Sequence, residues 1–335
     1  MKTQWQHYLQ TLNAQFDDQG FVAHFGDPHI ESKAAFEKAV WCDLSHIGII
    51  EISGEDAQTF LQGQLTNDVR QVSLEKSQLT AWCNAKGRVL ATFRLWKKEN
   101  AFYLVLPQDN IAAVLKRLSM YVLRSKVKLR EMTDEMHAIG LSGNFNQLLN
   151  LPDQENSVSF QEDKWILRLS GKKPNWLVIS TTEGLQKFTQ SLDKSVISAG
   201  KAVWDLLEIL NGIPQITSTT TDLFTPHMLN LQAIEGVSFK KGCYVGQEIV
   251  SRTQYLGKVK RRIFLAKVAS QTPTIGDNLV VEGEENTAQI VNVAPHFDGD
   301  CYLLAVISNA AVEMNKVHLS SGEPLIFLDL PYAVE

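Results

Sequence analysis

The stretch FKKGCYVGQE, residues 239–248, is the part of the chain on which our interpretation of fold and function depends. Lys240 and Lys241 place two positive charges directly before Cys243, and nearby cations lower the pKa of a thiol and raise its thiolate fraction. Glycines on both sides of the thiol permit unusual backbone angles and the close approach of a ligand. The pattern predicts a functional thiol, with Cys243 and Lys241 as its chemical groups.

A plainer interpretation of the same residues stays open. A lone cysteine between glycines is also typical of a buried turn, because reactivity requires both exposure and a lowered pKa. The other cysteines, Cys42, Cys83 and Cys301, stand far apart in the sequence, with no C-x-x-C pair and no histidine at ligand spacing. We therefore expect neither disulfides nor a bound metal, and we expect Cys243 to be the most reactive of the four thiols.

Upstream of this stretch the hydrophobic pattern changes between strand and helix periods. Ser53, followed by Glu55 and Asp56, predicts an N-cap and the first turn of a helix. Residues 108–123 carry a single apolar stripe and predict a second helix. Strands are expected at residues 46–53, 78–84, 88–96 and 101–106, with a hairpin turn at 85–87. This order predicts an α+β layer structure.

The second half of the chain changes character twice. Helices are expected at 183–193 and 199–210, and the Ser/Thr-rich segment 212–226 is expected to be a surface loop. From Arg262 onward, short β-type runs alternate with turn signals such as Asp298-Gly299. These runs predict a small C-terminal β-barrel or sandwich.

Length and composition limit the class of protein. At 335 residues and 44% hydrophobic content, the chain is long enough for two or three domains. No apolar run is long enough to cross a bilayer and the N-terminus lacks an apolar signal core, so we expect a cytoplasmic protein without membrane contact. The net charge of -5 gives a field that repels polyanions, so any nucleic-acid contact requires a local basic patch.

The motif at residues 240–248 closely resembles the signature of the YgfZ family, whose members are relatives of the glycine-cleavage aminomethyltransferase, the T-protein. The resemblance extends to residues 52–54 (ISG), 62–69 (QGQLTNDV) and 84–88 (NAKGR), and to Trp204 ahead of Gly212-Ile213-Pro214. It spans most of residues 44–262.

The resemblance implies a three-domain, ring-like arrangement with a C-terminal small β-barrel and a central hole for tetrahydrofolate or a derivative. On this basis we expect segments 1–50 and 200–260 to join residues 51–135 in an N-terminal folate-binding domain. Residues 136–199 are expected to form a second α+β domain, and residues 261–335 the C-terminal barrel.

The resemblance also suggests which residues bind folate. Trp204 corresponds to a tryptophan of the family's folate site, and its indole offers a stacking surface. Ile47 stands where some members carry a second tryptophan. The family's carboxylate ahead of Gly212 is replaced by Leu210, and Glu208 lies about 200° away on a helix, so we do not expect it to take that place. The remaining expected folate contacts come from the motifs at residues 62–69 and 240–248: Asn67, Lys240, Tyr244, Gln247 and Glu248.

Three functions follow as expectations. The first is a folate-binding maintenance protein that supports iron–sulfur enzymes or assembly proteins and thereby tRNA modification. The second, a folate-dependent aminomethyltransferase, is disfavoured because Ala91 and Thr92 stand where the T-protein keeps an acidic pair. The third, direct tRNA binding, draws on basic stretches at 111–130 and 258–262. Since such runs are often solvated faces, we expect tRNA to be reached only indirectly.

Overall fold

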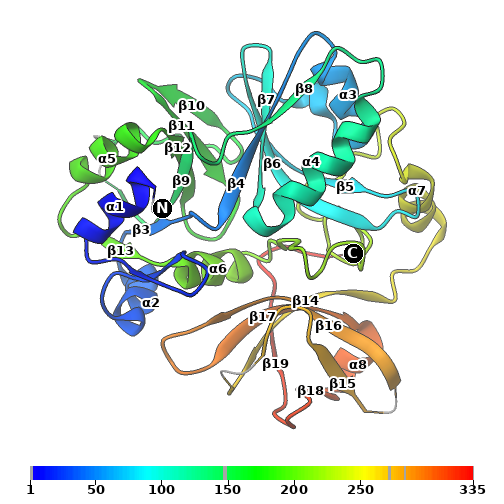
Figure 1. Ribbon diagram of the computed structural model, residues 1–335. Coiled ribbons are helices and arrows are strands. Elements are labelled where there is room, and N and C mark those ends of the chain that lie inside the picture. The colour runs from blue at the N-terminus through cyan, green and yellow to red at the C-terminus, as the bar shows by residue number, and fades with distance from the viewer. Residues whose placement is uncertain (1–2, 146–148, 271–272, 283, 335) are drawn as a thin grey trace.

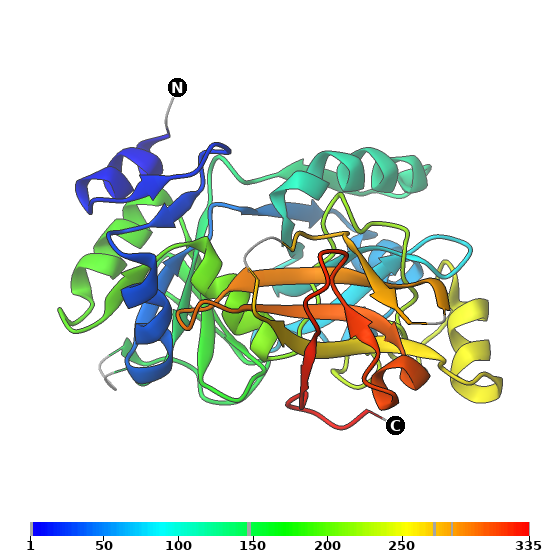
Figure 2. The same ribbon diagram turned by 90° about the horizontal axis from the view of Figure 1, so that it is seen from below.

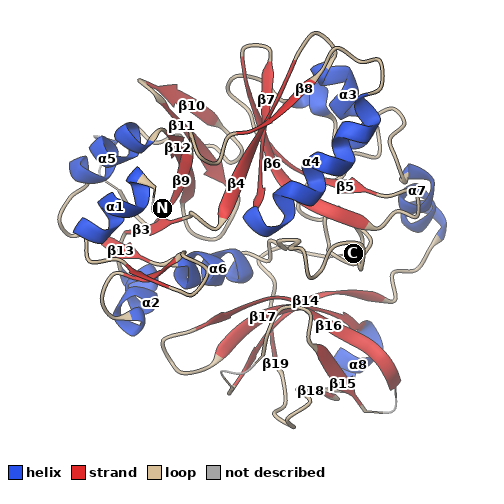
Figure 3. Cartoon of the chain, viewed as in Figure 1, coloured by secondary structure: helices blue, strands red, loops and turns tan. Residues whose placement is uncertain are grey.

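The computed structural model describes residues 3–145, 149–270, 273–282 and 284–334. It is a mixed α/β structure whose three larger β-sheets surround helix α6 (Lys201–Leu210), as Figure 1 shows. A two-stranded sheet of β1 (Gln15–Phe16) and β2 (Val22–His24) lies near the N-terminus. The colouring by secondary structure in Figure 3 shows α6 between the sheets, with most of the other helices toward the outside.

The first large sheet has five antiparallel strands in the order β5-β6-β7-β4-β8. Its strands are β4 (Ile47–Ser53), β5 (Gln78–Cys83), β6 (Val89–Lys98), β7 (Ala101–Pro107) and β8 (Lys128–Glu131). Helix α4 (Gln108–Val122) buries its predicted apolar stripe against this sheet, since Ile111, Val114 and Leu118 are all in the core. The strands, the hairpin and this helix confirm the sequence prediction.

The expected helix after β4 starts later than predicted. Ser53 still belongs to β4, and α3 (Ala57–Gln64) begins after Asp56 at its N-cap. Gly54 lies between them with φ +124°, a conformation that glycine adopts without strain. Asp56 does not cap α3 with its side chain, because its carboxylate accepts the backbone N–H of Lys126 at 2.8 Å. The serine N-cap was therefore wrong, although the helix itself was predicted correctly.

The second large sheet has six strands in the order β10-β11-β12-β9-β3-β13. All its pairings are antiparallel except that of β13 with β3, and its strands are β3 (Val40–Asp43), β9 (His137–Ser142), β10 (Val158–Gln161), β11 (Lys164–Leu169), β12 (Asn175–Ser180) and β13 (Ile197–Ala199). One face of this sheet packs with the helices α1 (Gln4–Thr11) and α5 (Thr182–Ser191), whereas α2 (Pro28–Glu37) packs with the opposite face, which also contacts α6.

The third large sheet, near the C-terminus, has six strands in the order β18-β15-β16-β17-β14-β19 and curls like half a barrel (Figure 2). Its strands are β14 (Arg261–Val268), β15 (Asn278–Val281), β16 (Glu284–Pro295), β17 (Cys301–Ser308), β18 (Val317–His318) and β19 (Ile326–Leu328). The short helix α8 (Asn309–Glu313) follows β17. The predicted C-terminal β structure is confirmed in this coarser form, and the division of the chain into three domains stays a prediction.

Candidate functional site

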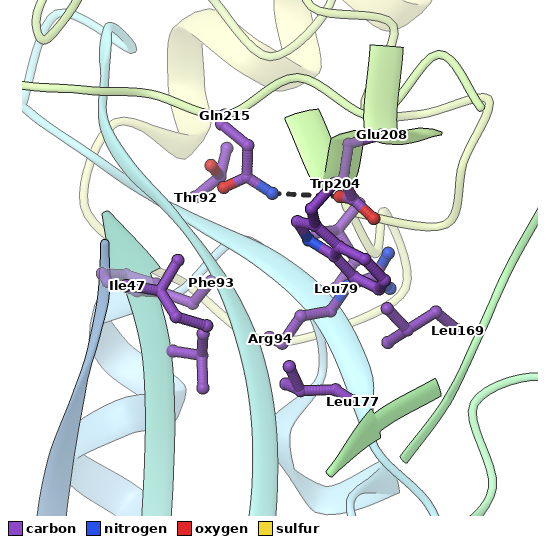
Figure 4. Close-up of a pocket in the computed structure, with 11 residues that line it drawn as sticks. Ile47, Leu79, Thr92, Phe93, Arg94, Leu169, Leu177, Trp204, Glu208 and Gln215 are labelled. Atoms are coloured by element: carbon purple, nitrogen blue, oxygen red, sulfur yellow. Dashed lines mark hydrogen bonds between the residues drawn. The ribbon is translucent and has the colours of Figure 1, made fainter. Parts of the chain in front are cut away.

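A cavity of about 400 Å³ lies beside α6, where β4 begins and β7 ends. Its walls come from α6, from the loop that follows α6 and from β16 of the C-terminal sheet. A smaller pocket of about 30 Å³ adjoins it and shares Ile47, Trp204 and Glu208 with it (Figure 4). All three large sheets thus contribute to one concave site, as is common for small-molecule sites.

Helix α6 determines which side chains face this cavity. Trp204 and Glu208 are four residues apart and therefore lie on the same side of the helix. The indole of Trp204 packs flat over β9 at Gly140, where an added Cβ would come within 2.3 Å of the ring. The absence of a side chain at Gly140 leaves room for the indole, which also lines the cavity.

Glu208 was not expected to contribute, but it lines both the cavity and the smaller pocket. Its Oε2 accepts a hydrogen bond of 3.1 Å from Nε2 of Gln215 (Figure 4). Burial raises the pKa of this carboxyl above its usual value, while the positive charge of Arg94 opposes that shift. The helix-wheel argument concerned only whether Glu208 replaces a carboxylate at position 210, so it did not address the side of α6 that Glu208 shares with Trp204.

Arg94 on β6 is the second residue that the sequence analysis missed. Its guanidinium is buried at the smaller pocket, and burial lowers its pKa. Within the described residues its Nη2 has no hydrogen-bond partner. A buried, unpaired donor of this kind is costly unless something accepts from it, which marks the pocket as a place for a polar ligand group. The signal available in the sequence was an arginine inside the mainly apolar part of this strand, residues 89–96.

The mouth of the cavity carries a second polar group. Lys201 forms an ion pair with Asp205 one turn along α6, and Nε2 of His46 lies 3.6 Å from the same aspartate. Burial is the main reason that the pKa of His46 falls to about 3, so this imidazole is neutral at physiological pH.

The residues of the 240–248 motif lie elsewhere, between α3 and α7 (Gln247–Leu256). Lys241 is buried, and its ammonium donates to three backbone carbonyls, those of Gln62 at 2.8 Å, Leu65 at 2.5 Å and Asn67 at 3.0 Å. These carbonyls belong to the end of α3 and the turn after it, so Lys241 caps that helix. Burial lowers the pKa of Lys241 to about 8.

Cys243 is exposed on the loop before α7, whereas the other three cysteines are buried. Burial raises the pKa of the Cys83 thiol to about 12 and raises those of Cys42 and Cys301 as well. These facts favour Cys243 as the accessible thiol. The motif's second lysine, however, uses its charge on the backbone of α3, as described above, and not on a ligand.

The structure therefore separates the predicted site residues into two groups. Trp204 and Ile47 line the cavity together. Asn67 belongs to the second group, and its side chain is fixed because its amide nitrogen donates to the carbonyls of Leu79 and Glu235. The members of that second group are absent from the described lining of the cavity: Asn67, Lys240, Lys241, Cys243, Tyr244, Gln247 and Glu248.

Two curated proteins are similar to this chain over nearly its whole length. The tRNA-modifying protein YgfZ of Colwellia psychrerythraea is 34% identical over 291 residues, which cover 84% of this chain and 89% of that protein. The tRNA-modifying protein YgfZ of Photobacterium profundum is 29% identical over 315 residues, covering 89% of this chain and 93% of that protein.

The chain belongs to the YgfZ family.

This YgfZ-family chain also matches the model of the GCVT N-terminal domain at residues 13–150. The crystal structure of glycine cleavage system aminomethyltransferase T from Bartonella henselae is similar in fold, with a TM-score of 0.75 and 16% identity. The likeness covers 98% of this chain and 97% of that one. The expected T-protein-like fold is thus confirmed.

On this fold, strand β6 shows what the YgfZ-family chain has in place of the T-protein's acidic pair. Successive residues of a strand face opposite sides. Ala91 is buried in the core under α4, while Thr92 lines the smaller pocket. The hydroxyl of Thr92 donates to the carbonyl of Pro214 at 3.3 Å and accepts the N–H of Ile216 at 3.3 Å. Of the two positions, only that of Thr92 faces the pocket, and its hydroxyl already makes both of these hydrogen bonds.

Two kinds of feature are absent from the described residues of this YgfZ-family chain. No cluster of three or more histidine, cysteine, aspartate or glutamate side chains there is arranged to hold a metal ion. No helix in that part of the chain is both long and apolar enough to pass through a bilayer.

Proposed function

We propose that this chain is a folate-binding maintenance protein that supports iron–sulfur enzymes or assembly proteins and thereby tRNA modification. The observation that carries the proposal is the cavity beside α6 with the smaller pocket that adjoins it: Trp204 and Glu208 line both, and the smaller pocket adds Arg94, whose Nη2 has no hydrogen-bond partner among the described residues. The similarity to relatives named as tRNA-modifying proteins supports the second part.

The residues of the cavity fit a reduced folate. Its volume of about 400 Å³ lies in the range of small-molecule sites. The pterin ring carries an amino group and a ring N–H, and both can donate to one carboxylate such as that of Glu208. It also carries a carbonyl oxygen, which suits a guanidinium such as that of Arg94. Trp204 supplies the flat apolar surface on which an aromatic ring of the ligand stacks.

Protonation of Glu208 gives this binding mode a pH dependence. Because burial raises the pKa of Glu208, part of the population is protonated at a pH at which an exposed glutamate is fully ionised. Only the ionised carboxylate accepts two hydrogen bonds from the pterin. Folate affinity should therefore increase as the pH rises through the raised pKa of Glu208.

The wider arrangement belongs to the same proposal. We place the folate cavity at the central hole of a three-domain ring, with the curled C-terminal sheet completing a small barrel. The client proteins are expected to meet the chain at the exposed thiol of Cys243. The chemistry on tRNA is then done by the iron–sulfur enzymes, in the cytoplasm.

Aminomethyl transfer is not part of the proposed function. General acid or base assistance typically contributes about 10² to 10⁴ in rate and requires a group with a suitable pKa within hydrogen-bond reach. Thr92, the pocket-facing residue of the pair on β6, has no such pKa and is held by the loop after α6. The folate is expected to act as a bound regulator and not as an acceptor of a one-carbon unit.

Anaerobic titration with tetrahydrofolate, followed by tryptophan emission, tests the proposal. Trp204→Ala and Glu208→Gln should each weaken binding about tenfold, since a lost stacking surface or charged hydrogen bond is worth about 1.4 kcal/mol. Trp82→Phe is the matched control, because Trp82 lies in the core under α4 and away from the cavity. If both cavity variants bind as tightly as the native chain, the folate site is not here. Glycine-dependent methylene transfer at the rate of a true T-protein would overturn the non-enzymatic part.

A further inference from the structure

Helix α7 stands at the edge of the molecule, far from α6 in both views (Figures 1 and 2). Its outward side is uncovered, since Arg252 is exposed, Tyr255 is 68% exposed and Leu256 is 83% exposed. The inward side is fixed by Val250, which is buried. A large aromatic and a large aliphatic side chain so fully open to solvent point to a surface that contacts something else.

Positive charge is concentrated around this helix. Residues 239–262 contain seven lysines and arginines and one acidic residue, Glu248, in a chain whose net charge is -5. The hairpin turn between β5 and β6 adds Lys86, and this turn packs on α7, because a Cβ at Gly87 would lie 3.0 Å from Cβ of Ile249. The local field is therefore opposite in sign to the charge of the whole molecule.

The other basic stretch of the chain, residues 111–130, is partly neutralised. Lys126 pairs with Glu55 at 2.7 Å, and Arg130 pairs with Glu135 at 2.7 Å and approaches Glu51 at 3.6 Å. Five exposed cations around α7 take part in none of the ion pairs found among the described residues: Lys86, Lys240, Arg252, Lys258 and Lys260. In the other stretch, Lys116, Arg124 and Lys128 are also exposed and outside these ion pairs, so the two stretches differ in degree.

We propose that the outward face of α7, with the cations at its two ends, binds RNA directly. Exposed lysines and arginines of this kind neutralise phosphates, and an exposed tyrosine among them stacks on an unpaired base. The ten residues of α7 extend over about 15 Å, and its flanking cations lengthen the strip beyond that. The surface therefore suits a short single-stranded segment, such as a loop or an end of a folded RNA.

This inference goes beyond the proposed function, in which tRNA is reached through client enzymes. It revises the expectation of purely indirect contact, which treated both basic stretches as solvated faces. An acidic protein is the competing occupant. RNA is favoured because the cations outnumber the acids by so much and because the most exposed aromatic side chain, Tyr255, stands among them.

The test uses the full chain with two probes, labelled oligouridine and unfractionated bacterial tRNA, at about 50 and about 200 mM KCl. Arg252→Gln with Lys258→Gln should lower the slope of log affinity against log salt by about 1.4 for the single strand. Tyr255→Ala should weaken binding about tenfold, and Tyr255→Phe should restore it, since a phenyl ring still stacks. The matched control is Lys38→Gln with Lys194→Gln, which removes the same charge from exposed positions that follow α2 and α5, two helices on the side of Figure 1 opposite α7.

The results separate the possibilities. The inference is supported if the α7 variants lose affinity and salt dependence while the control pair keeps both. No retention of either RNA at about 50 mM KCl would overturn it and leave an acidic protein as the occupant. Equal loss in the control pair would also overturn it, by showing that binding follows net charge alone. Tetrahydrofolate affinity, measured on the same variants, reports on the proposed function independently.

Discussion

Gly140 on β9 gives the most direct way to disturb the cavity without touching any residue that lines it. The backbone of Gly140 is fixed by pairing with Cys42 on one side and Leu177 on the other. A Cβ at this position would lie 2.3 Å from both Cε3 and Cζ3 of Trp204. Carbon atoms pack at about 3.5 Å, so in Gly140→Ala the indole has to move by about 1.2 Å, and such a shift changes the lining of the cavity.

Two measurable effects follow from that displacement. Overpacking of this kind costs about 1–3 kcal/mol, so the free energy of unfolding of Gly140→Ala in urea should fall by that amount. Tetrahydrofolate should bind about fivefold more weakly, since a misplaced ring loses about 1 kcal/mol of stacking. Gly63→Ala is the control, because a Cβ at Gly63 in α3 meets nothing within 4 Å and should be neutral or slightly stabilising.

A double-mutant cycle decides whether the indole is responsible. Trp204→Leu removes the ring atoms that the new methyl would meet, so Gly140→Ala should cost little stability in that background. An equal cost in both backgrounds would refute the packing argument. A clear coupling with unchanged folate affinity would keep the packing argument and remove Trp204 from the ligand site.

Three further predictions concern the buried charges and the thiol. Lys241→Met should lower the free energy of unfolding by about 3 kcal/mol, because three carbonyls lose a charged donor. The same change at its exposed neighbour, Lys240→Met, should have little effect. Equal losses of stability for the two variants in urea would contradict this prediction. Burial raises the pKa of Asp43 to about 6. Between about pH 4 and pH 6 the unfolded chain therefore releases a proton that the folded chain keeps, and the free energy of unfolding should fall by about 3 kcal/mol as the pH rises. Asp43→Asn should flatten the plot of unfolding free energy against pH in this range. Iodoacetamide should label Cys243 first, and Cys243→Ser should unfold at the native urea concentration; labelling of a buried cysteine at the same rate would show that the core opens readily.

The strands, the helices α4 and α6 and the C-terminal β structure could be predicted because each has a hydrophobic period that its own residues determine. The start of α3 could not, since Asp56 is occupied by the backbone of Lys126, a contact 70 residues away in the sequence. Local capping rules compare only neighbouring residues. They fail where tertiary structure supplies a competing partner for the side chain.

The site shows the same division. Trp204 and Ile47 were expected from the family resemblance, whereas Arg94 and Glu208 were missed because no local pattern joins β6 to α6. Strand β6 did hold a usable signal. Its alternation places Thr92 and Arg94 on one side and Ala91 on the other, where α4 covers the sheet. An arginine on the side away from the covering helix needs a partner elsewhere. Only the folded chain shows that Arg94 lines the smaller pocket beside Trp204.

The separation of the motif from the cavity changes what the motif is for. In the sequence, Lys241 and Cys243 look like one chemical unit, a cation beside a thiol. In the structure, the ammonium of Lys241 points inward to the end of α3, while the thiol of Cys243 is exposed before α7. Because Lys241 anchors the loop and Cys243 is displayed by it, we expect loss of Lys241 to act through folding and loss of Cys243 to act through lost contacts. Cys243 is exposed and is not part of the described cavity lining, so we propose that its thiol meets partners that approach from solvent and not a folate bound beside Trp204.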